Sequence, residues 1–440
     1  MSGPARLLTL TAPTPEALEQ ATDDLAARLD GLDDTAFARL PAIPDATRSV
    51  RRPLCRAVAA SSPADAARRL RRRDPRRVFT GGPAPDRPSR VFLFCGVGDQ
   101  YPGLGAGLYR CVPAFRRELD RCFAVLDAEH GLDPRPVLFP PDTGATADLR
   151  GGDALARLYD HRATAQEIHR TVVAQPLVFS VQYALARALT ELGAAPAALA
   201  GYSIGEPAAA CVAGVLTLQD ALRLVVRRAR LMAELPPGAM LAVMAGPGQL
   251  TAYLDGTVSV AALNGPAQTV LSGPAGPIEQ AARELTAQGV ACRRLATTHA
   301  FHSAQARPLA KPLERLLGTL PLRPPALPLL SSVTGNWLRA EEATSPGYWA
   351  AQLSRTIRFA DQLTLAWRLP RPLLVELGPG QALSRLALQH PDRPADAPAR
   401  VVQTLPGVFE SRPEAELLLT ALGQLWTAGT DIDWGQVAVE

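Results

Sequence analysis

The sequence predicts an α/β protein with a parallel-sheet core, a smaller subdomain inserted into that core, and a small α/β unit before it. Three observations predict this class. Short apolar runs alternate with segments of helical periodicity, which is the order that a parallel sheet with crossover helices produces. The order of elements changes between residues 235 and 297, and proline-rich punctuation separates residues 1–88 from the rest. A chain of 440 residues is also long for one core.

Residues 1–88 are expected to form a small α/β unit of their own. The run ARLLTL at 5–10 is typical of a short strand, and an amphipathic helix follows it. Residues 51–60 and 64–73 repeat the pattern of a strand and then a helix. The stretch GPAPDRP at 82–88 then marks a boundary, because proline and glycine interrupt regular structure.

Two stretches, 89–234 and 298–400, are expected to form the core. The first opens with the apolar strand Arg90–Phe94, which runs directly into Gly96-Val97-Gly98. A second apolar strand, at 196–201, is followed by a sharp turn and a helix of small residues. The remaining elements expected in the core are a strand at 373–377 and helices at 112–128, 165–191 and 205–213.

The order of expected elements in residues 235–297 differs from that in the core segments on either side. Their order is roughly strand, helix, strand, strand, helix, strand, with the helices at 247–254 and 276–288. This is the ferredoxin-like order, so an inserted subdomain is expected. Residues 401–440 are expected to form a separate tail, with a helix and an acidic-aromatic end within 412–436.

Composition and charge exclude several classes of function. The formal net charge of +4 is too small to indicate a nucleic-acid partner. The N-terminus has no secretory pattern, and no stretch approaches the roughly 20 apolar residues that span a bilayer, so a cytoplasmic protein without a membrane partner is expected. The six cysteines show no metal-ligand spacing, and no bound metal or redox cofactor is expected.

One basic cluster lies between residues 68 and 77. Its members are Arg68, Arg69, Arg71, Arg72, Arg73, Arg76 and Arg77. The first interpretation is a solvated helix end, and the alternative is a docking surface for an acidic partner. No aromatic residues interleave with the arginines, which argues against binding of single-stranded nucleic acid.

The strongest chemical signal is the turn Gly201-Tyr202-Ser203-Ile204-Gly205, which joins an apolar strand to a helix. A nucleophile held at such a turn leaves no room for side chains two positions away, which explains the glycines. The turn exposes the hydroxyl and places it at a helix N-terminus, where free N–H groups favour negative charge. The sequence therefore predicts Ser203 as a nucleophile that accepts acyl groups. The alternative is a glycine-rich turn with an incidental serine.

A serine nucleophile needs a general base and two hydrogen-bond donors for the oxyanion. Among six histidines, His302 stands out because it lies where the chain returns to the core; the alternative is a core or surface histidine without a catalytic role. The N–H of Ile204, directly after the nucleophile, is one candidate donor. The loop Gly96-Val97-Gly98 is the candidate for the second donor.

Several segments, taken in order, resemble the motifs of acyltransferase domains of modular polyketide synthases and of the related malonyl-CoA:acyl-carrier-protein transacylases. Residues 94–100 resemble the FxGQGxQ opening, Gly201–Glu206 resembles GHSxGE, and Arg228–Met232 resembles the RGxLM helix. The other matching segments are Gln175-Pro176, Gln182–Leu185, Asn264–Pro266, His299–His302, Gln352–Phe359 and Glu376–Gly380. Residues 1–88 resemble the linker that joins a ketosynthase to the acyltransferase, and 412–436 resemble the linker that follows it. The resemblance implies an α/β-hydrolase-like core.

The resemblance assigns roles to the residues of the site. Ser203 becomes the acylated nucleophile and His302 its general base. Val97 and Ile204 would supply the oxyanion N–H groups, and Gln352 would orient the imidazole through its backbone carbonyl. The residues implied in substrate binding are Arg228, Tyr202, Gln175, His299, Phe301 and Asn264.

The implied substrate is malonyl-CoA. In the family the position of Arg228 holds the free carboxylate of a malonyl-type acyl group, which suits the planar guanidinium; the alternative is an ordinary helix arginine, since Arg227 and Arg230 lie beside it. The form His-Ala-Phe-His at 299–302 is associated with malonyl rather than methylmalonyl selection, because Phe301 would crowd an α-methyl group. One methyl group is worth only about 1–3 kcal/mol of discrimination.

Three residues depart from the family pattern. Tyr202 replaces the usual histidine before the serine, Val97 replaces a glutamine, and Thr356 stands where proline is usual. The first two lie at the expected acyl site, so they bear on which acyl group is accepted. They leave the Ser–His pair in place.

The preferred hypothesis is a ping-pong transfer of malonyl from malonyl-CoA to the phosphopantetheine thiol of an acyl carrier protein, with no bound cofactor. A ketosynthase is a further expected partner through residues 1–88. The chain is expected either to act on separate partners or to be a part of a larger synthase, and its start at Met1 favours the free-standing enzyme. The second hypothesis is transfer of a non-malonyl acyl group between carriers, or hydrolysis of stalled acyl thioesters. The third is an inert docking domain.

Overall fold

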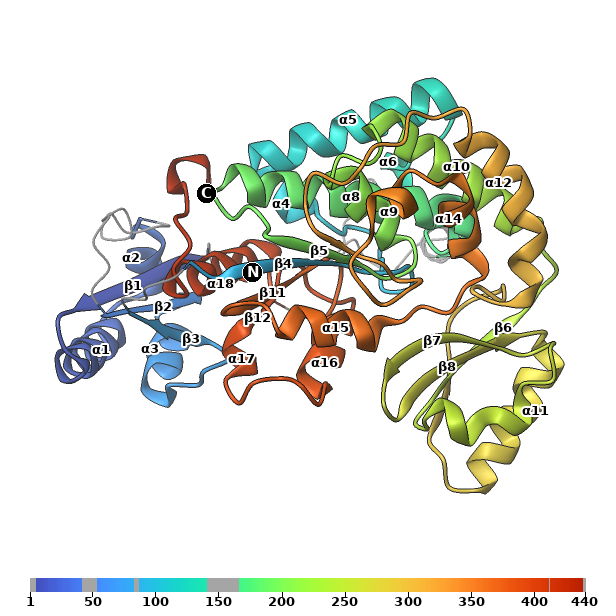
Figure 1. Ribbon diagram of the computed structural model, residues 1–440. Coiled ribbons are helices and arrows are strands. Elements are labelled where there is room, and N and C mark those ends of the chain that lie inside the picture. The colour runs from blue at the N-terminus through green and yellow to red at the C-terminus, as the bar shows by residue number, and fades with distance from the viewer. Residues whose placement is uncertain (1–4, 42–53, 83–86, 141–165, 411, 438–440) are drawn as a thin grey trace, which may run out of the picture.

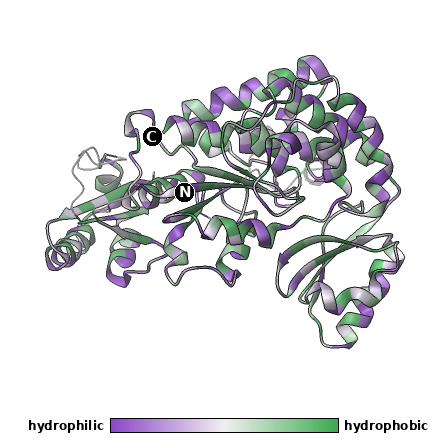
Figure 2. Ribbon diagram, viewed as in Figure 1, coloured by the Kyte–Doolittle hydropathy of each residue, from purple (hydrophilic) through white to green (hydrophobic). Residues whose placement is uncertain are grey.

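A computed structural model of the chain describes residues 5–41, 54–82, 87–140, 166–410 and 412–437. It contains three sheets: a three-stranded sheet at one end, a five-stranded sheet in the middle and a four-stranded sheet at the other end (Figure 1). The apolar residues concentrate in the strands of the central sheet and on the helix sides that face it, whereas the outer helices carry the polar residues (Figure 2).

The N-terminal unit is an antiparallel sheet in the order β1-β2-β3. Alternate residues of its strands face opposite sides, as the pleat requires. Leu8 and Val58 pack with the helices α1 and α3, whereas Leu7 and Ala57 face Gly423 of the C-terminal helix α18. The elements of this unit are β1 (Arg6–Ala12), α1 (Pro15–Asp30), α2 (Asp34–Ala38), β2 (Leu54–Ala60), α3 (Pro63–Arg72) and β3 (Val78–Gly81), and α18 spans Glu414–Thr427.

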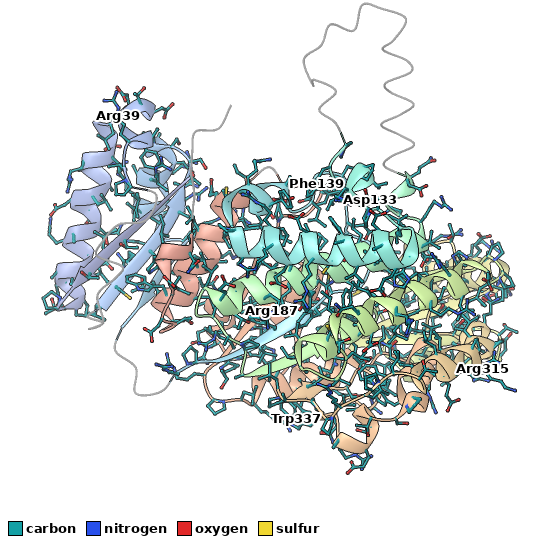
Figure 3. The ribbon with its side chains drawn as sticks, turned by 90° about the horizontal axis from the view of Figure 1, so that it is seen from above. Arg39, Asp133, Phe139, Arg187, Arg315 and Trp337 are labelled. Atoms are coloured by element: carbon teal, nitrogen blue, oxygen red, sulfur yellow. The ribbon has the colours of Figure 1, made fainter. Side chains whose placement is uncertain are left out.

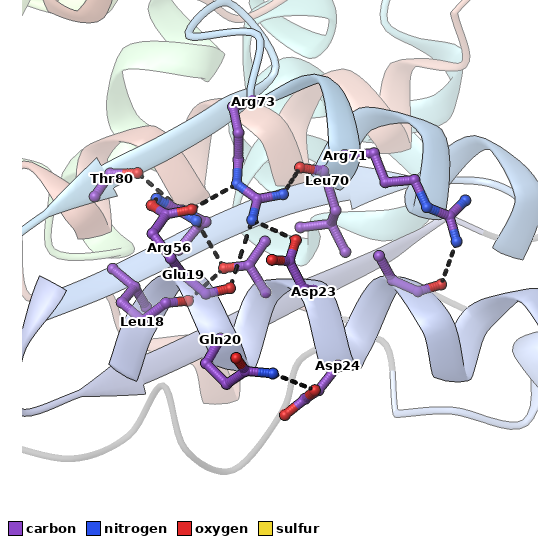
Figure 4. A network of polar contacts seen from close by, with 12 residues as sticks. Leu18, Glu19, Gln20, Asp23, Asp24, Arg56, Leu70, Arg71, Arg73 and Thr80 are labelled. Carbon is purple, nitrogen blue, oxygen red and sulfur yellow. Dashed lines mark hydrogen bonds and ion pairs between the residues drawn. The ribbon is translucent and has the colours of Figure 1, made fainter. Parts of the chain in front are cut away.

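The basic cluster is largely paired inside this unit. Arg73 binds both Glu19 and Asp23 of α1, and Glu19 also accepts a hydrogen bond from the buried Arg56 of β2 (Figure 4). The other ion pairs of the cluster are Arg68–Asp65, Arg69–Asp65, Arg69–Glu416 and Arg71–Asp30. Much of the positive charge therefore ties α3 to α1 and α18, which fits the first interpretation better than a free docking surface.

The central sheet is parallel, in the order β10-β5-β4-β11-β12. β5 and β11 are completely buried, and β4 is buried from Val91 to Phe94, as expected for a parallel sheet covered on both faces. Helices α5, α8, α9 and α10 lie over one face, and α15 and α16 lie over the other (Figure 1). Seen from above, α5 and α8 run side by side across the sheet (Figure 3). These elements are β4 (Ser89–Phe94), α5 (Pro113–His130), α8 (Thr171–Glu191), β5 (Ala198–Gly201), α9 (Gly205–Val212), α10 (Leu218–Ala233), β10 (Leu329–Leu330), α15 (Phe359–Trp367), β11 (Pro372–Leu377), α16 (Ala382–Gln389) and β12 (Val401–Gln403).

Two expectations about the core need correction. Residues 401–403 were expected in the tail, but they form β12 and pair in parallel with β11, so the core sheet extends past residue 400. No segment was expected to be long and apolar enough to cross a membrane, but α8 meets that test by length and composition among the described residues. Since 89% of the tested window of α8 is buried inside the protein, we interpret α8 as a core helix.

The third sheet belongs to the inserted segment and is antiparallel, in the order β7-β8-β6-β9. Its sequence of elements is the expected ferredoxin-like one, except that the first helix is a 3-10 helix. It has a separate apolar core around Leu241, Leu271 and Leu285. The elements are β6 (Ala239–Val243), η2 (Pro247–Tyr253), β7 (Ser259–Gly265), β8 (Gln268–Gly273), α11 (Ala275–Ala287) and β9 (Cys292–Arg294).

Short helices connect these parts. They are α4 (Ala106–Cys111), α6 (Arg135–Leu138), η3 (Ala304–Leu309), α12 (Ala310–Leu317), α13 (Ala340–Ala343), α14 (Pro346–Ala351), η4 (Gln352–Ser354), α17 (Ala397–Arg400) and η5 (Trp434–Gln436). The segment from η3 to η4 matters most for the site, because it returns from the inserted sheet to the carboxyl ends of β5 and β4.

Candidate active site

Ser203 occupies a sharp turn between β5 and α9. Its φ of 56° lies in the left-handed region, a strained conformation for a serine. The turn is held by a hydrogen bond from the N–H of Tyr202 to the carbonyl oxygen of Phe94, 2.8 Å long. A Cβ atom at Gly201 would lie 2.3 Å from the Cα of Glu206, and a Cβ atom at Gly205 would lie 2.1 Å from the Phe94 carbonyl oxygen. Both glycines are therefore required by close backbone approach, which is the reason the sequence predicted.

The turn brings Ser203 to His302 across 99 positions of the chain. The Oγ atom of Ser203 lies 2.8 Å from Nε2 of His302, and Nδ1 of the same ring lies 3.0 Å from the carbonyl oxygen of Arg355. A carbonyl only accepts, so the proton resides on Nδ1 and leaves Nε2 free to accept the serine proton. His302 also has a positive φ, 55°, and its N–H donates to the carbonyl oxygen of Leu353.

The imidazole of His302 is neutral in the resting site. Burial, together with the positive charge of Arg228, lowers its pKa to about 3, while the backbone carbonyls of Arg355 and Gln352 act in the opposite direction. The side chain is only 2% exposed. A neutral, oriented imidazole is the form that a general base requires.

Gln352 was expected to orient His302 through its backbone carbonyl, and the structure gives it a different main contact. Nδ1 donates its 3.0 Å hydrogen bond to the carbonyl oxygen of Arg355, three residues further along, although the Gln352 carbonyl also acts on the ring. The side chain of Gln352 instead donates to the carbonyl oxygen of Ser203, at 2.8 Å, and to Oε2 of Glu206, at 3.1 Å. The side chain of Gln352 therefore stabilises the turn that carries Ser203.

Glu206 is a site residue to which the sequence analysis gave no role. It lies in the first turn of α9, is completely buried, and accepts hydrogen bonds from the N–H of Ser332, the hydroxyl of Tyr348 and the amide of Gln352. Burial raises its pKa, and these donors oppose the rise. A glutamate among the small residues of the helix after the turn was the available signal. Its contacts join the nucleophile turn to the segment that carries the base.

Arg228 points inward from α10 and is 3% exposed. Its Nη2 atom donates to Oγ of Ser203 at 3.4 Å. Its Nε and Nη1 atoms are buried, and neither has a hydrogen-bond partner among the described residues. Burial lowers the pKa of the guanidinium to about 10, opposed by the charge of Glu206, so Arg228 stays positive at neutral pH. Each of these unpaired donors can bind an oxygen atom of a carboxylate.

Tyr202 directly precedes the nucleophile Ser203 in the turn, and its ring packs against Phe359 and Gly96. Its ring meets Phe359 edge-on, with the centroids 5.5 Å apart, and it contacts Gly96 so closely that a Cβ there would lie 3.3 Å from Cδ1. Burial raises the pKa of the Tyr202 phenol to about 12, and a hydrogen bond from Asn264 of β7 acts against this rise. The phenol is therefore neutral and polar, and it faces the inserted sheet.

The other residues that were expected to bind substrate come from two different parts of the chain. His299 and Phe301, two residues apart, stack with centroids 6.0 Å apart just before His302. Gln175 of α8 is 2% exposed and contacts Met232, which lies one turn after Arg228 on α10. The Oε1 atom of Gln175 is buried and has no hydrogen-bond partner among the described residues.

Two backbone N–H groups are available for an oxyanion. Within the described chain, no hydrogen bond uses the N–H of Val97 or of Ile204. The loop that carries Val97 is fixed on both sides: Gln182 donates to the Cys95 carbonyl oxygen at 2.8 Å, and the Gly98 N–H donates to Gln100. Ile204 lies at the N-terminus of α9, where N–H groups have no partner inside the helix.

The reactive groups that the site presents are a nucleophile, a base, an arginine and backbone donors. In the part of the chain that the structure describes, no group of three or more His, Cys, Asp or Glu side chains is arranged to hold a metal ion.

A parallel α/β core with a serine at a strand-to-helix turn, together with an inserted antiparallel sheet, is the architecture of acyltransferase domains. The chain belongs to the family described as acyl transferase domain, which its residues 91–405 match. The match ends at 405 and so includes β12, in agreement with the extended core.

The relatives are large polyketide synthases. One component of the phenolphthiocerol/phthiocerol polyketide synthase of Mycobacterium tuberculosis is 37% identical over 351 residues, which is 80% of this chain and 22% of that protein. Polyketide synthase GfsA of Streptomyces halstedii is 35% identical over 78% of this chain and 4% of its own length. The chain thus spans about a fifth or less of these curated relatives.

Solved acyltransferase structures match nearly the whole chain. The acyl transferase domain of ZmaA superposes with a TM-score of 0.81 at 31% identity, covering 99% of this chain and 97% of that one. The acyl transferase domain of SpnD, solved in complex with 2-(pent-4-yn-1-yl)malonyl, has a TM-score of 0.78 at 35% identity over 98% and 97%. The malonyl CoA-acyl carrier protein transacylase of Burkholderia pseudomallei has a TM-score of 0.57 at 28% identity and covers 68% of this chain and 97% of its own.

Proposed function

We propose that this acyltransferase transfers a malonyl-type acyl group from coenzyme A to an acyl carrier protein through an ester on Ser203. The observation that carries the proposal is the position of Arg228, whose Nη2 reaches Ser203 Oγ at 3.4 Å while Nε and Nη1 stay buried without a partner among the described residues. An unpaired buried guanidinium is costly, and a substrate carboxylate would satisfy it. A non-carboxylated acyl group would leave it unpaired.

In the first half-reaction, Oγ of Ser203 attacks the thioester carbonyl while Nε2 of His302, 2.8 Å away, takes its proton. The N–H groups of Val97 and Ile204 stabilise the negative charge on the former carbonyl oxygen. The C–S bond then breaks, and the imidazolium returns its proton to the leaving thiolate of coenzyme A. The product is malonyl-Ser203 and free coenzyme A.

The second half-reaction runs the same steps in reverse. The phosphopantetheine thiol of the carrier protein gives its proton to His302 and attacks the ester, and the Ser203 oxygen leaves with that proton. Arg228 keeps the acyl carboxylate in place throughout, so the reacting carbonyl stays at Oγ. The carrier protein is the proposed partner, and the ketosynthase contact of residues 1–88 is a further proposal that rests on the linker resemblance.

The preference for malonyl over methylmalonyl is supported by crowding near the base. The stacked rings of His299 and Phe301 lie directly before His302, and Tyr202 adds a rigid ring against Phe359 on the other side. The similar domain of SpnD was solved in complex with 2-(pent-4-yn-1-yl)malonyl, a carboxylated acyl group, which supports a malonyl-type substrate for this chain.

Intact-protein mass spectrometry tests this proposal. The protein is incubated separately with malonyl-CoA, methylmalonyl-CoA and acetyl-CoA, with the Ser203→Ala variant as a matched control. We expect a malonyl mass gain on the wild type that disappears in Ser203→Ala, a smaller gain from methylmalonyl-CoA and the smallest gain, from a slow reaction, with acetyl-CoA. Equal labelling by acetyl-CoA would contradict the role of Arg228, and absence of malonyl labelling would contradict the proposal as a whole.

A further inference from the structure

Three consecutive residues, Arg355, Thr356 and Ile357, connect the catalytic histidine to the inserted four-stranded sheet. The carbonyl oxygen of Arg355 accepts the hydrogen bond from Nδ1 of His302, at 3.0 Å. The hydroxyl of Thr356 donates to the carbonyl oxygen of Val260 in β7, at 2.7 Å. These two contacts are one peptide unit apart, so a shift of one moves the other.

Ile357 extends this connection along the edge of β7. Its N–H donates to the Ala261 carbonyl oxygen at 2.9 Å, its carbonyl accepts from the N–H of Leu263 at 2.8 Å, and it forms a parallel bridge with Ala262. The pairing of β7 with β8 shifts register between Val260 and Ala262. A bulge of this kind turns a strand locally away from its partner, and here it directs backbone groups of β7 toward the segment beside His302.

The Thr356 contact is made by a side chain, in addition to the backbone hydrogen bonds of Ile357. The hydrogen bond to Val260 therefore adds a side-chain link between the inserted sheet and the core, next to the peptide that holds the base.

We propose that Thr356 is a positioning residue for His302. Its bond to Val260 holds the Arg355 carbonyl in line with Nδ1, which keeps the proton on that nitrogen and keeps Nε2 directed at Ser203. The inserted sheet thus has a second role besides lining the acyl site: it sets the tautomer of the base. The inference rests on the proposed acyl transfer only for its kinetic consequence, since the tautomer exists without substrate.

The kinetic test compares Thr356→Val, which keeps the shape and removes the hydroxyl, with Thr356→Ser, which keeps the hydroxyl. Thr344→Val is the matched control, because the Thr344 hydroxyl also donates to a backbone carbonyl, within α13 and away from the site. We expect kcat for malonyl transfer to fall about 3- to 10-fold in Thr356→Val, with KM unchanged, as suits one neutral hydrogen bond. Thr356→Ser and Thr344→Val should keep the wild-type kcat.

A substrate-free test follows the ring itself. The protein is labelled with ¹⁵N-histidine, and the His302 signals are identified by their loss in His302→Gln. We expect the wild type to show the Nδ1–H tautomer alone, and Thr356→Val to show a mixture. If Thr356→Val does not fold, Thr356→Ala provides a second variant without the hydroxyl.

The outcomes separate this inference from the proposed function. An unchanged His302 spectrum and unchanged kcat in Thr356→Val would overturn the positioning role, even with full malonyl transfer by the wild type. A tautomer mixture in Thr356→Val, with a wild type that malonyl-CoA does not acylate, would support the positioning role and overturn the proposed function. Failure of Thr356→Ser to restore the wild-type spectrum would also overturn the positioning role.

Discussion

The guanidinium of Arg228 and the hydroxyl of Ser203 lie within hydrogen-bond distance, with Nη2 3.4 Å from Oγ. The arginine comes from α10 and the serine from the turn before α9, so two separate helices bring these side chains together. Arg228 also lowers the pKa of His302 by its charge. One side chain therefore contacts Ser203 and also acts electrostatically on His302.

Replacing Arg228 should separate carboxylated from plain acyl donors. Arg228→Ala removes a charge-assisted pair with the substrate carboxylate, so kcat/KM for malonyl-CoA should fall about 10- to 100-fold. The slow reaction with acetyl-CoA should be unaffected, because acetyl makes no such pair. Steady-state kinetics with both donors measures this. Arg227→Ala, an exposed neighbour on the same helix, is the control and should behave as the wild type. Equal losses for both donors would argue for a structural role of Arg228.

Activity should persist at mildly acidic pH, because the pKa of His302 is held at about 3. The neutral ring is the active form, so kcat/KM for acylation should stay flat from about pH 8 to 5 and fall only as protonation begins at lower pH. Binding of a carboxylate beside Arg228 offsets the positive charge that lowers this pKa. The acid limb of kcat should therefore lie at higher pH than that of kcat/KM. A limb of kcat/KM at about pH 6.5, the ordinary histidine value, would contradict the lowered pKa.

Replacing His302 tests its proposed role as the general base. His302→Ala should slow Ser203 acylation by about 10²- to 10⁴-fold, the usual range for loss of a general base. Rapid-quench measurement of the acyl-enzyme gives this rate directly. His130→Ala is the control, since His130 lies at the end of α5 and is not part of the site. An acylation rate retained in His302→Ala would show that another group takes the serine proton.

The nucleophile turn should not tolerate a methyl group at Gly205. In Gly205→Ala the new Cβ would lie 2.1 Å from the carbonyl oxygen of Phe94. Since that oxygen belongs to the backbone of a core strand, it cannot move aside as a flexible side chain could. We expect a loss of about 3 kcal/mol or more in the free energy of unfolding, measured in urea. Gly276→Ala in α11 is the control, because a Cβ there meets no atom within 4 Å and alanine favours the helix. Similar stability of the two variants would contradict the close approach.

Local signals predicted the elements and the nucleophile well. The glycines on either side of Ser203, the apolar strand before it and the small-residue helix after it all lie within a few residues, so the sequence alone placed the turn. The apolar positions of α10 could also have predicted that Arg228 is buried. Because Arg227 and Arg230 lie close by, the sequence analysis kept the alternative of an ordinary helix arginine. These features depend on contacts between near neighbours in the chain.

Contacts between residues far apart in the chain could not be predicted from the sequence. The strand β12 has three residues, and only its pairing with β11 shows that it belongs to the core. The acceptor for His302 was expected to be the Gln352 carbonyl; that carbonyl does act on the ring, but the 3.0 Å hydrogen bond of Nδ1 goes to the Arg355 carbonyl. The brace formed by Glu206 joins positions more than a hundred residues apart.

By itself the sequence determined the fold class and the turn that carries the candidate nucleophile Ser203, because steric need and periodicity are local, whereas the other expected site residues were implied mainly by the family resemblance. Only the tertiary structure decided which atoms meet: which carbonyl holds the base, which guanidinium nitrogens stay unpaired, and that Thr356 links the inserted sheet to the site. Hydrogen bonds have a short reach and a strict direction, so their partners are settled by the path of the folded chain.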